Sequence, residues 1–352
     1  MPLIAHNDLP TYDRLLGEGR VILPPDRAYQ QDIRELHIGF LNMMPDAALE
    51  ATERQFFRLI GESNKIAQFH IHPFNIPPIQ RSEEALAHIN KYYEPWEKIK
   101  EDGLDALIIT GANADTNPPV RDIEGWKELT EVLDWAKDNV ASILCSCLSS
   151  HFVMSYWHNS PPTRLPQKRF GIYSHRVINR EHPITRSMNT IVDMPHARNN
   201  GLSEQQFLDA GMDVLISGED SGVHMAASKD GIRLVCMQGH PEYDTFSILK
   251  EYRRDLVWYH SGKIDKRPPY PHKYFNDESI QAIEAWEAAG AIPETFPEKE
   301  IEKLLENTWH DSARAMIANW IGAVYQVTNV DRKKQFMDGI NPGDPFNQYQ
   351  ES

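Results

Sequence analysis

Two short stretches hold the residues best suited to covalent chemistry, and the first surrounds Cys147. Residues 140–151 read VASILCSCLSSH, an apolar segment that runs into Cys145, Cys147 and several serines. An apolar run that ends abruptly in small residues predicts a buried strand that turns sharply into a helix. Such a turn would hold the Cys147 side chain outward as a nucleophile, with Cys145 inside the strand. On this stretch alone, the alternative that both cysteines are inert core residues stays open.

The second stretch supplies a base and a carboxylate. Residues 234–244 read LVCMQGHPEYD, a short apolar strand followed by His240 and Glu242. A histidine just beyond a strand end, with an acid two residues later, is what a thiol nucleophile needs. We therefore expect Cys147 to attack, His240 to take its proton and Glu242 to hold the imidazole in the productive tautomer.

The composition narrows the class of protein. A chain of 352 residues can bury a core as one large domain or two modest ones. Its 36 basic and 51 acidic side chains give a net charge of −15, which argues against a nucleic-acid partner. No apolar run approaches the roughly 18 residues of a membrane helix, and the N-terminus lacks the pattern of a secretory signal. Three cysteines make no disulfide framework, so we expect a cytoplasmic protein with no membrane partner.

Strand and helix patterns alternate along the chain. Apolar runs predict strands at 36–42, 66–74, 104–110 and 232–237 and directly before Cys147, and helical patterns cover 47–60, 82–98, 126–136, 252–260 and 308–327. This alternation predicts an α/β fold whose mostly parallel sheet carries helices on both faces. Ligands gather beyond the carboxyl ends of such strands, so Asp46, residues 111–115, Cys147 and His240 should line one cleft.

The chain divides into three predicted parts. Residues 1–34 form an N-terminal arm, and residues 35–260 form the catalytic domain. Residues 261–352, which include a proline-rich acidic stretch and the predicted helix at 308–327, form an excursion and a helix packed on the same domain.

A metal site is not expected. His70 and His72 lie two residues apart on the predicted strand at 66–74 and are possible ligands. No cluster of cysteine, histidine or aspartate with the spacing of a metal site accompanies them in the sequence, so we expect no bound metal.

Several motifs together resemble the homoserine O-acyltransferases of methionine biosynthesis, which are built on the class I glutamine amidotransferase (flavodoxin-like) fold. The resemblance runs from residue 9 to about residue 326. Besides the Cys147 turn, it rests on LNMMP at 41–45, ITGA at 109–112, FGIYSH at 170–175, PHAR at 195–198, GHPEYD at 239–244 and EYRRD at 251–255. The last two motifs, at their fixed separation, are the most specific.

The resemblance implies a two-step acyl transfer. Cys147 would take an acyl group from an acyl-coenzyme A as a thioester, and His240, oriented by Glu242, would then activate the γ-hydroxyl of L-homoserine. Backbone N–H groups near Leu148 and in the turn that ends at Ala47 would stabilise the oxyanion. No cofactor would be bound apart from the acyl-CoA co-substrate, and the chain would form a homodimer.

Substrate contacts follow from the same resemblance. Lys168 and Arg254 match the amino-acid-binding residues of the family, because a basic group suits the homoserine carboxylate. Ala197 and Arg198 lie in the family's PHSR-like motif, where Ala197 replaces the usual serine and removes a hydroxyl from the substrate site.

Two further departures concern the oxyanion and the acyl group. Asp46 and Ala47 stand where many members have a lysine pair, so a cation that would help the oxyanion hole is missing. Asp115 falls at the position whose identity is associated with acyl choice, glycine with succinyl and glutamate with acetyl. An acid there would repel the carboxylate of a succinyl group, so we expect an acetyl donor, with succinyl as the alternative.

Other functions stay open on the sequence. A glutamine amidotransferase or γ-glutamyl hydrolase would use the same cysteine, histidine and glutamate on the same fold. An acyltransferase acting on another hydroxy amino acid, such as serine, would fit the changes at Asp46 and Ala197. A catalytically silent binding protein would keep the fold but show no thiol reactivity.

Overall fold

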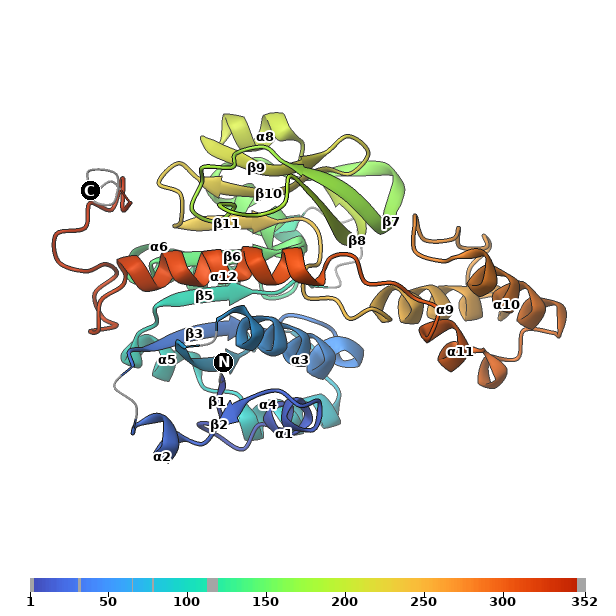
Figure 1. Cartoon of the computed structure of the whole chain (residues 1–352), viewed down its shortest axis with the longest axis horizontal. Coiled ribbons are helices and arrows are strands. Elements are labelled where there is room, and N and C mark those ends of the chain that lie inside the picture. Colours follow the sequence, from blue (N-terminus) through green and yellow to red (C-terminus); the bar gives the residue numbers. More distant parts are fainter. Residues whose placement is uncertain (1–2, 31–32, 65, 78, 113–119, 347–352) are drawn as a thin grey trace.

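The computed structural model describes residues 3–30, 33–64, 66–77, 79–112 and 120–346, and its strands join into one sheet (Figure 1). The strands are β1 (Leu3–Ile4), β2 (Ile22–Leu23), β3 (Glu35–Leu41), β4 (Gln68–Phe74), β5 (Ala106–Ile109), β6 (Ser142–Ser146), β7 (Thr163–Val177), β8 (Ile191–Gly201), β9 (Met212–Gly218), β10 (Gly222–Ser228) and β11 (Leu234–Met237). The helices are α1 (Pro10–Gly17), α2 (Pro25–Ala28), α3 (Asp46–Ser63), α4 (Glu83–Tyr92), α5 (Trp96–Asp102), α6 (Trp126–Asn139), α7 (Leu148–Trp157), α8 (Glu204–Asp209), α9 (Ser247–His260), α10 (Asp277–Ala288), α11 (Glu298–Glu302) and α12 (His310–Val327). Short 3₁₀ turns lie at Val120–Asp122 and Pro293–Thr295.

The sheet has a parallel part and an antiparallel part. Its order is β2-β1-β4-β3-β5-β6-β11-β10-β9-β7-β8. All neighbours from β2 to β11 are parallel, and those from β11 to β8 are antiparallel. The predicted α/β fold with a mostly parallel sheet is therefore confirmed. The strand before Cys147 lies between β5 and β11, at the centre of this sheet.

Apolar side chains point to both faces of the central strands, because both faces are covered by helices. Alternate residues of β5 show this: Ile108 packs with the core under α3 and α12, whereas Leu107 packs with the core under α6 and α7. Figure 1 shows α12 lying along one face of the sheet. Near-continuous apolar runs are typical of such doubly covered parallel strands.

The helical stretch predicted at 82–98 is two helices. α4 ends at Tyr92, and α5 begins at Trp96 directly after Pro95. Proline has no N–H to donate and disfavours a helical conformation in the residue before it, so the chain changes direction there.

The two ends of the chain also contribute to this architecture. In the part described, residues 3–30 supply β1 and β2 at one edge of the sheet, and α1 packs on α3. α9, α10 and α11 form a lobe that projects to one side of the sheet, and α12 then returns across it (Figure 1).

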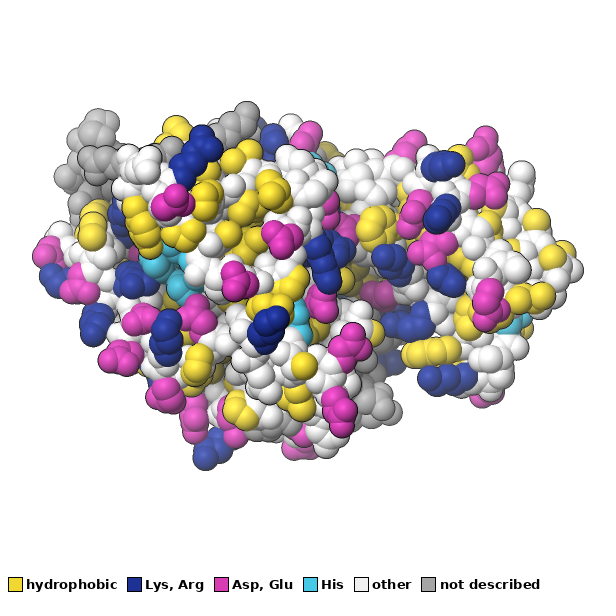
Figure 2. All heavy atoms as spheres, turned by 90° about the horizontal axis from the view of Figure 1, so that it is seen from below, with side chains coloured by type: hydrophobic (Ala, Val, Ile, Leu, Met, Phe, Trp, Pro, Cys, Tyr) yellow, Lys and Arg dark blue, Asp and Glu magenta, His cyan; other side chains and the backbone are white. Residues whose placement is uncertain are grey.

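The surface carries charges of both signs. Figure 2 views the molecule from the side of α1 and α2 and shows Lys and Arg side chains interspersed with Asp and Glu over that face. Among the described residues, no helix is both long enough and apolar enough to cross a membrane.

Candidate active site

Cys147 occupies the sharp turn that the sequence predicts. β6 ends at Ser146, α7 begins at Leu148, and Cys147 between them has φ 53° and ψ −112°. This strained conformation is the one that presents a nucleophile at the end of a strand. The Cys147 N–H is fixed by a 2.7 Å hydrogen bond to the carbonyl of Met237 in β11.

Ser149 and Ser150 anchor the start of α7 directly behind Cys147. The Ser149 hydroxyl donates to the carbonyls of Ile109 (2.8 Å) and Ser146 (2.9 Å). The Ser150 hydroxyl donates to the carbonyls of Cys145 (2.9 Å) and Met237 (3.1 Å). These bonds fasten the first turn of α7 to the ends of β5, β6 and β11.

Cys147, His240 and Glu242 form one chain of contacts. The Cys147 and His240 side chains are hydrogen-bonded, and His240 Nδ1 lies 2.7 Å from Glu242 Oε1. His240 and Glu242 are 5% and 7% exposed, so both are shielded from water, whereas Cys147 is half-buried. The sequence prediction placed these three residues together, and the geometry is that of a nucleophile, a base and an orienting carboxylate.

The electrostatics of the site favour a charged imidazole. Burial by itself would lower the pKa of His240, but the negative charges of the Cys147 thiolate and of Glu242 raise that pKa well above its ordinary value. The other two cysteines differ: burial raises the pKa of Cys236 to about 12 and also raises that of Cys145. Both are therefore protonated thiols in the core.

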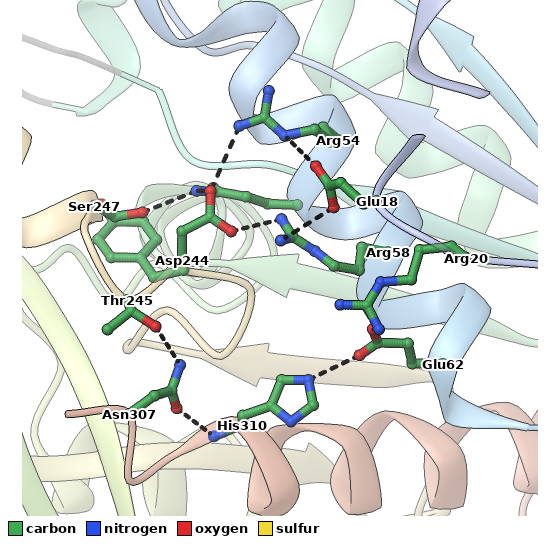
Figure 3. Close-up of polar contacts among 12 residues, drawn as sticks. Glu18, Arg20, Arg54, Arg58, Glu62, Asp244, Thr245, Ser247, Asn307 and His310 are labelled. Atoms are coloured by element: carbon green, nitrogen blue, oxygen red, sulfur yellow. Dashed lines mark hydrogen bonds and ion pairs between the residues drawn. The ribbon is translucent and has the colours of Figure 1, made fainter. Parts of the chain in front are cut away.

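The His240 corner is tied to α3 by Asp244. Figure 3 shows Asp244 between Arg54 and Arg58: its carboxylate lies 2.5 Å from Arg58 and 3.5 Å from Arg54. Gln55 also donates to Asp244, at 3.1 Å. Asp244 is buried, so these contacts fix the loop on which Glu242 lies. Behind the loop is a pocket lined in part by Glu242, Asp244, Arg58 and His310.

A polar cluster continues from His240 toward Lys168. The Tyr243 ring stacks on His240 with centroids 4.2 Å apart, and its hydroxyl donates to Glu251 at 3.1 Å. Lys168 Nζ lies 3.4 Å from Glu251 and 3.6 Å from Asp255.

Arg254 lies at the outer side of that cluster. Its guanidinium is 2.7 Å from Asp255, which also pairs with Lys168, and 5.0 Å from the centre of the Trp258 ring. The two predicted carboxylate-binding cations, Lys168 and Arg254, thus lie in one cluster, and each has an acidic neighbour. Arg254 is about half exposed, at 48% of its side chain, so a ligand can reach it.

Arg198 is placed differently. It is 4% exposed, and its guanidinium donates to His196 Nδ1 and to the carbonyls of Asn200 and Ser221. Burial and the Arg169 charge lower the pKa of Arg198 to about 10, while the negative charge of Cys147 opposes this shift. Arg198 therefore lies close enough to the nucleophile to affect it electrostatically, but its donors are already engaged.

Ala197 is on the strand face next to Lys168. It is directly opposite Phe170 in the register of β8 and β7, and Lys168 Nζ lies 3.9 Å from the centre of the Phe170 ring.

The predicted oxyanion donors lie around Gly111. A methyl group added at Gly111 would be 3.5 Å from Cys147 Cβ and 3.8 Å from Met44 Sδ, so the ends of β3, β5 and β6 meet there. Leu148 is the first residue of α7, and Ala47 is the second residue of α3. N–H groups in a first helical turn have no acceptor within their own helix and are available to an anion.

Arg81 supports this turn, and sequence reasoning missed it. Its side chain is 1% exposed; it donates to the carbonyls of Met44 and Asn42 and pairs with Asp46 at 3.2 Å. The Ser82 N–H, together with Arg81, lowers the pKa of Asp46. A cation is thus present beside the turn, although the lysine pair expected from the family is absent.

Other predicted and unpredicted residues complete the site. Asp115, the predicted acyl-specificity residue, lies outside the described residues. Tyr243 and Glu251 were within recognised motifs but were given no role. Their positions in the sequence, close to His240 and Arg254, could have indicated a role. Arg81 lies in a separate loop outside the motifs, so nothing in the sequence pointed to it.

Comparisons with known proteins place the chain in a family. A family model described as homoserine O-succinyltransferase matches residues 2–330. Homoserine O-succinyltransferases from Allochromatium vinosum (52% identical, 98% of this chain and 99% of the relative) and Methylobacter tundripaludum (51%, 98% and 99%) are among its relatives.

Two glutamine amidotransferases are among the solved structures that match this chain. The protein from Thermotoga maritima is 10% identical over 82% of this chain and 97% of that chain, with a TM-score of 0.45. The protein from Methylobacillus flagellatus is 13% identical over 83% and 95%, with a TM-score of 0.47. It is the sequence relatives that identify the family: the chain belongs to the homoserine O-succinyltransferases, and the predicted enzyme class, homoserine O-acyltransferase, is confirmed.

Proposed function

We propose that this protein transfers a succinyl group from succinyl-CoA to the hydroxyl of L-homoserine through a thioester on Cys147. The observation that carries this proposal is the contact chain of Cys147, His240 and Glu242 at the carboxyl ends of the central strands. The names of the relatives support the succinyl donor. A homodimer and a cytoplasmic location stay predictions.

The first step forms the thioester. The Cys147 thiolate attacks the thioester carbonyl carbon of the acyl-CoA, and the tetrahedral oxyanion is held by the N–H groups of Leu148 and Ala47. The C–S bond to coenzyme A then breaks. The His240 imidazolium gives its proton to the departing coenzyme A thiolate and becomes neutral.

The second step returns the proton. Neutral His240 removes the proton of the homoserine hydroxyl as its oxygen attacks the Cys147 thioester. The second tetrahedral oxyanion uses the same N–H groups, and the C–S bond to Cys147 breaks. The step releases the acyl ester and restores the thiolate and the imidazolium, which Glu242 stabilises in both steps.

The polar cluster beyond His240 suits a zwitterionic amino acid. Lys168 and Arg254 would hold the α-carboxylate, and Glu251 and Asp255 would hold the α-ammonium. The pairs that these four side chains make with one another keep the site neutral before homoserine binds.

The acyl donor was expected to be acetyl because of Asp115, which lies outside the described residues. The relatives are named for succinyl, and our proposal follows them. A basic group close to the nucleophile, Arg198, gives a favourable field for the free carboxylate of a succinyl group.

Intact-protein mass spectrometry tests the donor and the nucleophile together. The chain is mixed separately with succinyl-CoA and acetyl-CoA, beside Cys147→Ser and, as a matched control, Cys145→Ser. We expect one succinyl adduct in the wild type and in Cys145→Ser, none in Cys147→Ser, and loss of the adduct on adding homoserine but not serine.

Other outcomes would change specific parts of the proposal. An adduct with acetyl-CoA alone would replace the donor and restore the expectation from Asp115. Discharge by serine would replace the acceptor. No adduct with either donor, with all thiols reduced, would contradict the thioester mechanism, and glutamine hydrolysis would then be assayed.

A further inference from the structure

Six ligand-type side chains meet far from Cys147 in the sequence, at the amino-terminal half of β3 and β4. We call them the histidine cluster: His6, Glu35, His37, His70, His72 and Glu94. In the parallel register of β3 and β4, His37 is paired with His70, so residues two apart on each strand share one face of the sheet. The observation that His70 and His72 have no ligand-type companions holds for the sequence but is wrong in space.

Glu35, His37 and His70 have the separation of ligands around one ion. Glu35 Oε2 lies 3.3 Å from His37 Nε2 and 3.5 Å from His70 Nε2. Two ligands bound tetrahedrally to zinc, at bonds of about 2.0–2.1 Å, are about 3.4 Å apart. The His37 and His70 rings are stacked, with centroids 4.6 Å apart and an interplanar angle of 12°. The rings must therefore rotate out of this stack for both lone pairs to converge beside Glu35.

Hydrogen-bond counting leaves one contact of this cluster without a proton. A chain of three contacts runs from Glu35 through His37 and His72 to Glu94: 3.3 Å from Glu35 to His37 Nε2, 2.9 Å from His37 Nδ1 to His72 Nε2, and 2.6 Å from His72 Nδ1 to Glu94. Two neutral imidazoles supply only two N–H groups for three contacts. If His72 donates to Glu94 and His37 donates to His72, a lone pair of His37 faces the Glu35 carboxylate. A cation between them satisfies both.

A second observation points to the same place. His70 is 3% exposed, and its Nε2 is buried without a hydrogen-bond partner among the described residues. Buried polar atoms are nearly always satisfied, and this one is directed to the Glu35 oxygen that also faces His37.

We propose that Glu35, His37 and His70 bind a Zn²⁺ ion, with a water molecule in the fourth position. Two imidazoles and one carboxylate are a ligand set that zinc accepts. His72 and Glu94 would orient His37 through its other nitrogen, an arrangement that recurs behind metal-bound histidines. Arg332 lies close enough for its charge to affect Glu35 and His37, and it would compete with the ion for Glu35.

The ion would link two neighbouring strands inside the parallel part of the sheet. Glu35 and His37 are on β3 and His70 is on β4, so metal binding joins two neighbouring strands and stabilises the native chain but not the unfolded one. At zinc a hundredfold above its dissociation constant, we expect the melting temperature to rise by roughly 4 °C.

Zinc titration of the full chain tests the site. The titration is made in a Cys147→Ser background, because the active-site thiol can itself bind zinc. After chelator treatment, calorimetry should find one zinc ion per chain, and cobalt(II) should give the absorption of a tetrahedral site with nitrogen and oxygen ligands.

Variants separate a specific site from adventitious binding. In the same background, His70→Gln and Glu35→Gln should each weaken zinc binding by at least roughly 100-fold, and His72→Gln should weaken it roughly 10–100-fold. His158→Gln, on the exposed end of α7, should bind as the parent does. Glu35 is partly exposed, so its variant is expected to fold even if His70→Gln does not. No zinc bound by the parent, or unchanged binding in Glu35→Gln, would overturn the proposal.

Discussion

The catalytic end of the sheet and the histidine cluster place the same side chain in opposite surroundings. At the catalytic end, His240 lies between a thiol and a carboxylate, so each ring nitrogen has a partner and the two negative charges raise its pKa. In the histidine cluster, burial lowers the pKa of His70 to about 3 and that of His37 still further. These two rings share a single carboxylate, that of Glu35. Burial opposes the charged imidazole in both places, and at His240 the nearby negative charges outweigh it. One site is therefore built to hold and pass a proton, and the other is built to leave lone pairs available.

The largest expected effect is the loss of the catalytic imidazole. His240→Gln should lower the kcat/KM of acyl transfer roughly 1,000-fold, because His240 is the base in contact with Cys147. Steady-state kinetics with a thiol-release assay measures this. His158→Gln is the control and should change activity less than twofold; equal losses in both variants would contradict the assignment of the base.

Glu242→Gln should have a smaller effect and a characteristic pH signature. The pKa of His240 is raised in the native chain, so its contribution to stability is present below the unfolded pKa and is lost as the pH rises through the native pKa. Removing the Glu242 charge lowers the native pKa. The basic limb of the pH profile of kcat/KM should therefore move to lower pH, and the rate should fall roughly 100-fold. An unshifted limb would mean that Glu242 does not set the charge of His240.

Arg81 tests how far the catalytic end depends on one buried cation. Arg81→Met leaves two carbonyls and Asp46 without their partner, so the free energy of unfolding should fall by about 3 kcal/mol. Urea unfolding measures this fall, and kcat/KM should decrease as the turn at Met44 loosens. Arg121→Met is a suitable comparison, because Arg121 is exposed and should contribute less than about 1 kcal/mol. Equal stability of the two variants would remove Arg81 from this role.

The smallest expected effect is that of Glu35→Gln, in the histidine cluster, on the free energy of unfolding. In the metal-free chain, Glu35→Gln provides the missing N–H for His37, so the free energy of unfolding should rise by about 1 kcal/mol. Thermal unfolding in chelator measures this change. A clear loss of stability would show that the cluster already holds the proton it needs, and that the two histidine environments differ less than the hydrogen-bond count indicates.

The central strands and the catalytic residues could be predicted from the sequence because their signals are local. An apolar run ending in small residues located the Cys147 turn, and the run before GHPEYD located His240. β8 was missed, because Asp193, Pro195 and Arg198 interrupt its apolar pattern. The residues of β8 form a strand because they pair with β7, and this tertiary contact outweighs their weak local strand pattern.

Features that depend on distant segments were not predicted. Arg81 lies between predicted elements and reaches the turn at Met44 across the end of β3. The histidine cluster joins residues from four separate segments, so no spacing rule could find it. Such sites depend on which strands become neighbours, and local sequence patterns do not reveal this.

The long route of the chain to α12 has a consequence for synthesis on the ribosome. Trp320 in α12 donates to the Ser142 hydroxyl at 2.8 Å, and its side chain is fully buried against the face that β6 helps to form. That face stays uncovered until residues 310–327 have emerged, long after the strands beneath them. The nascent enzyme therefore exposes an apolar surface for much of its translation, when chaperone binding would matter most.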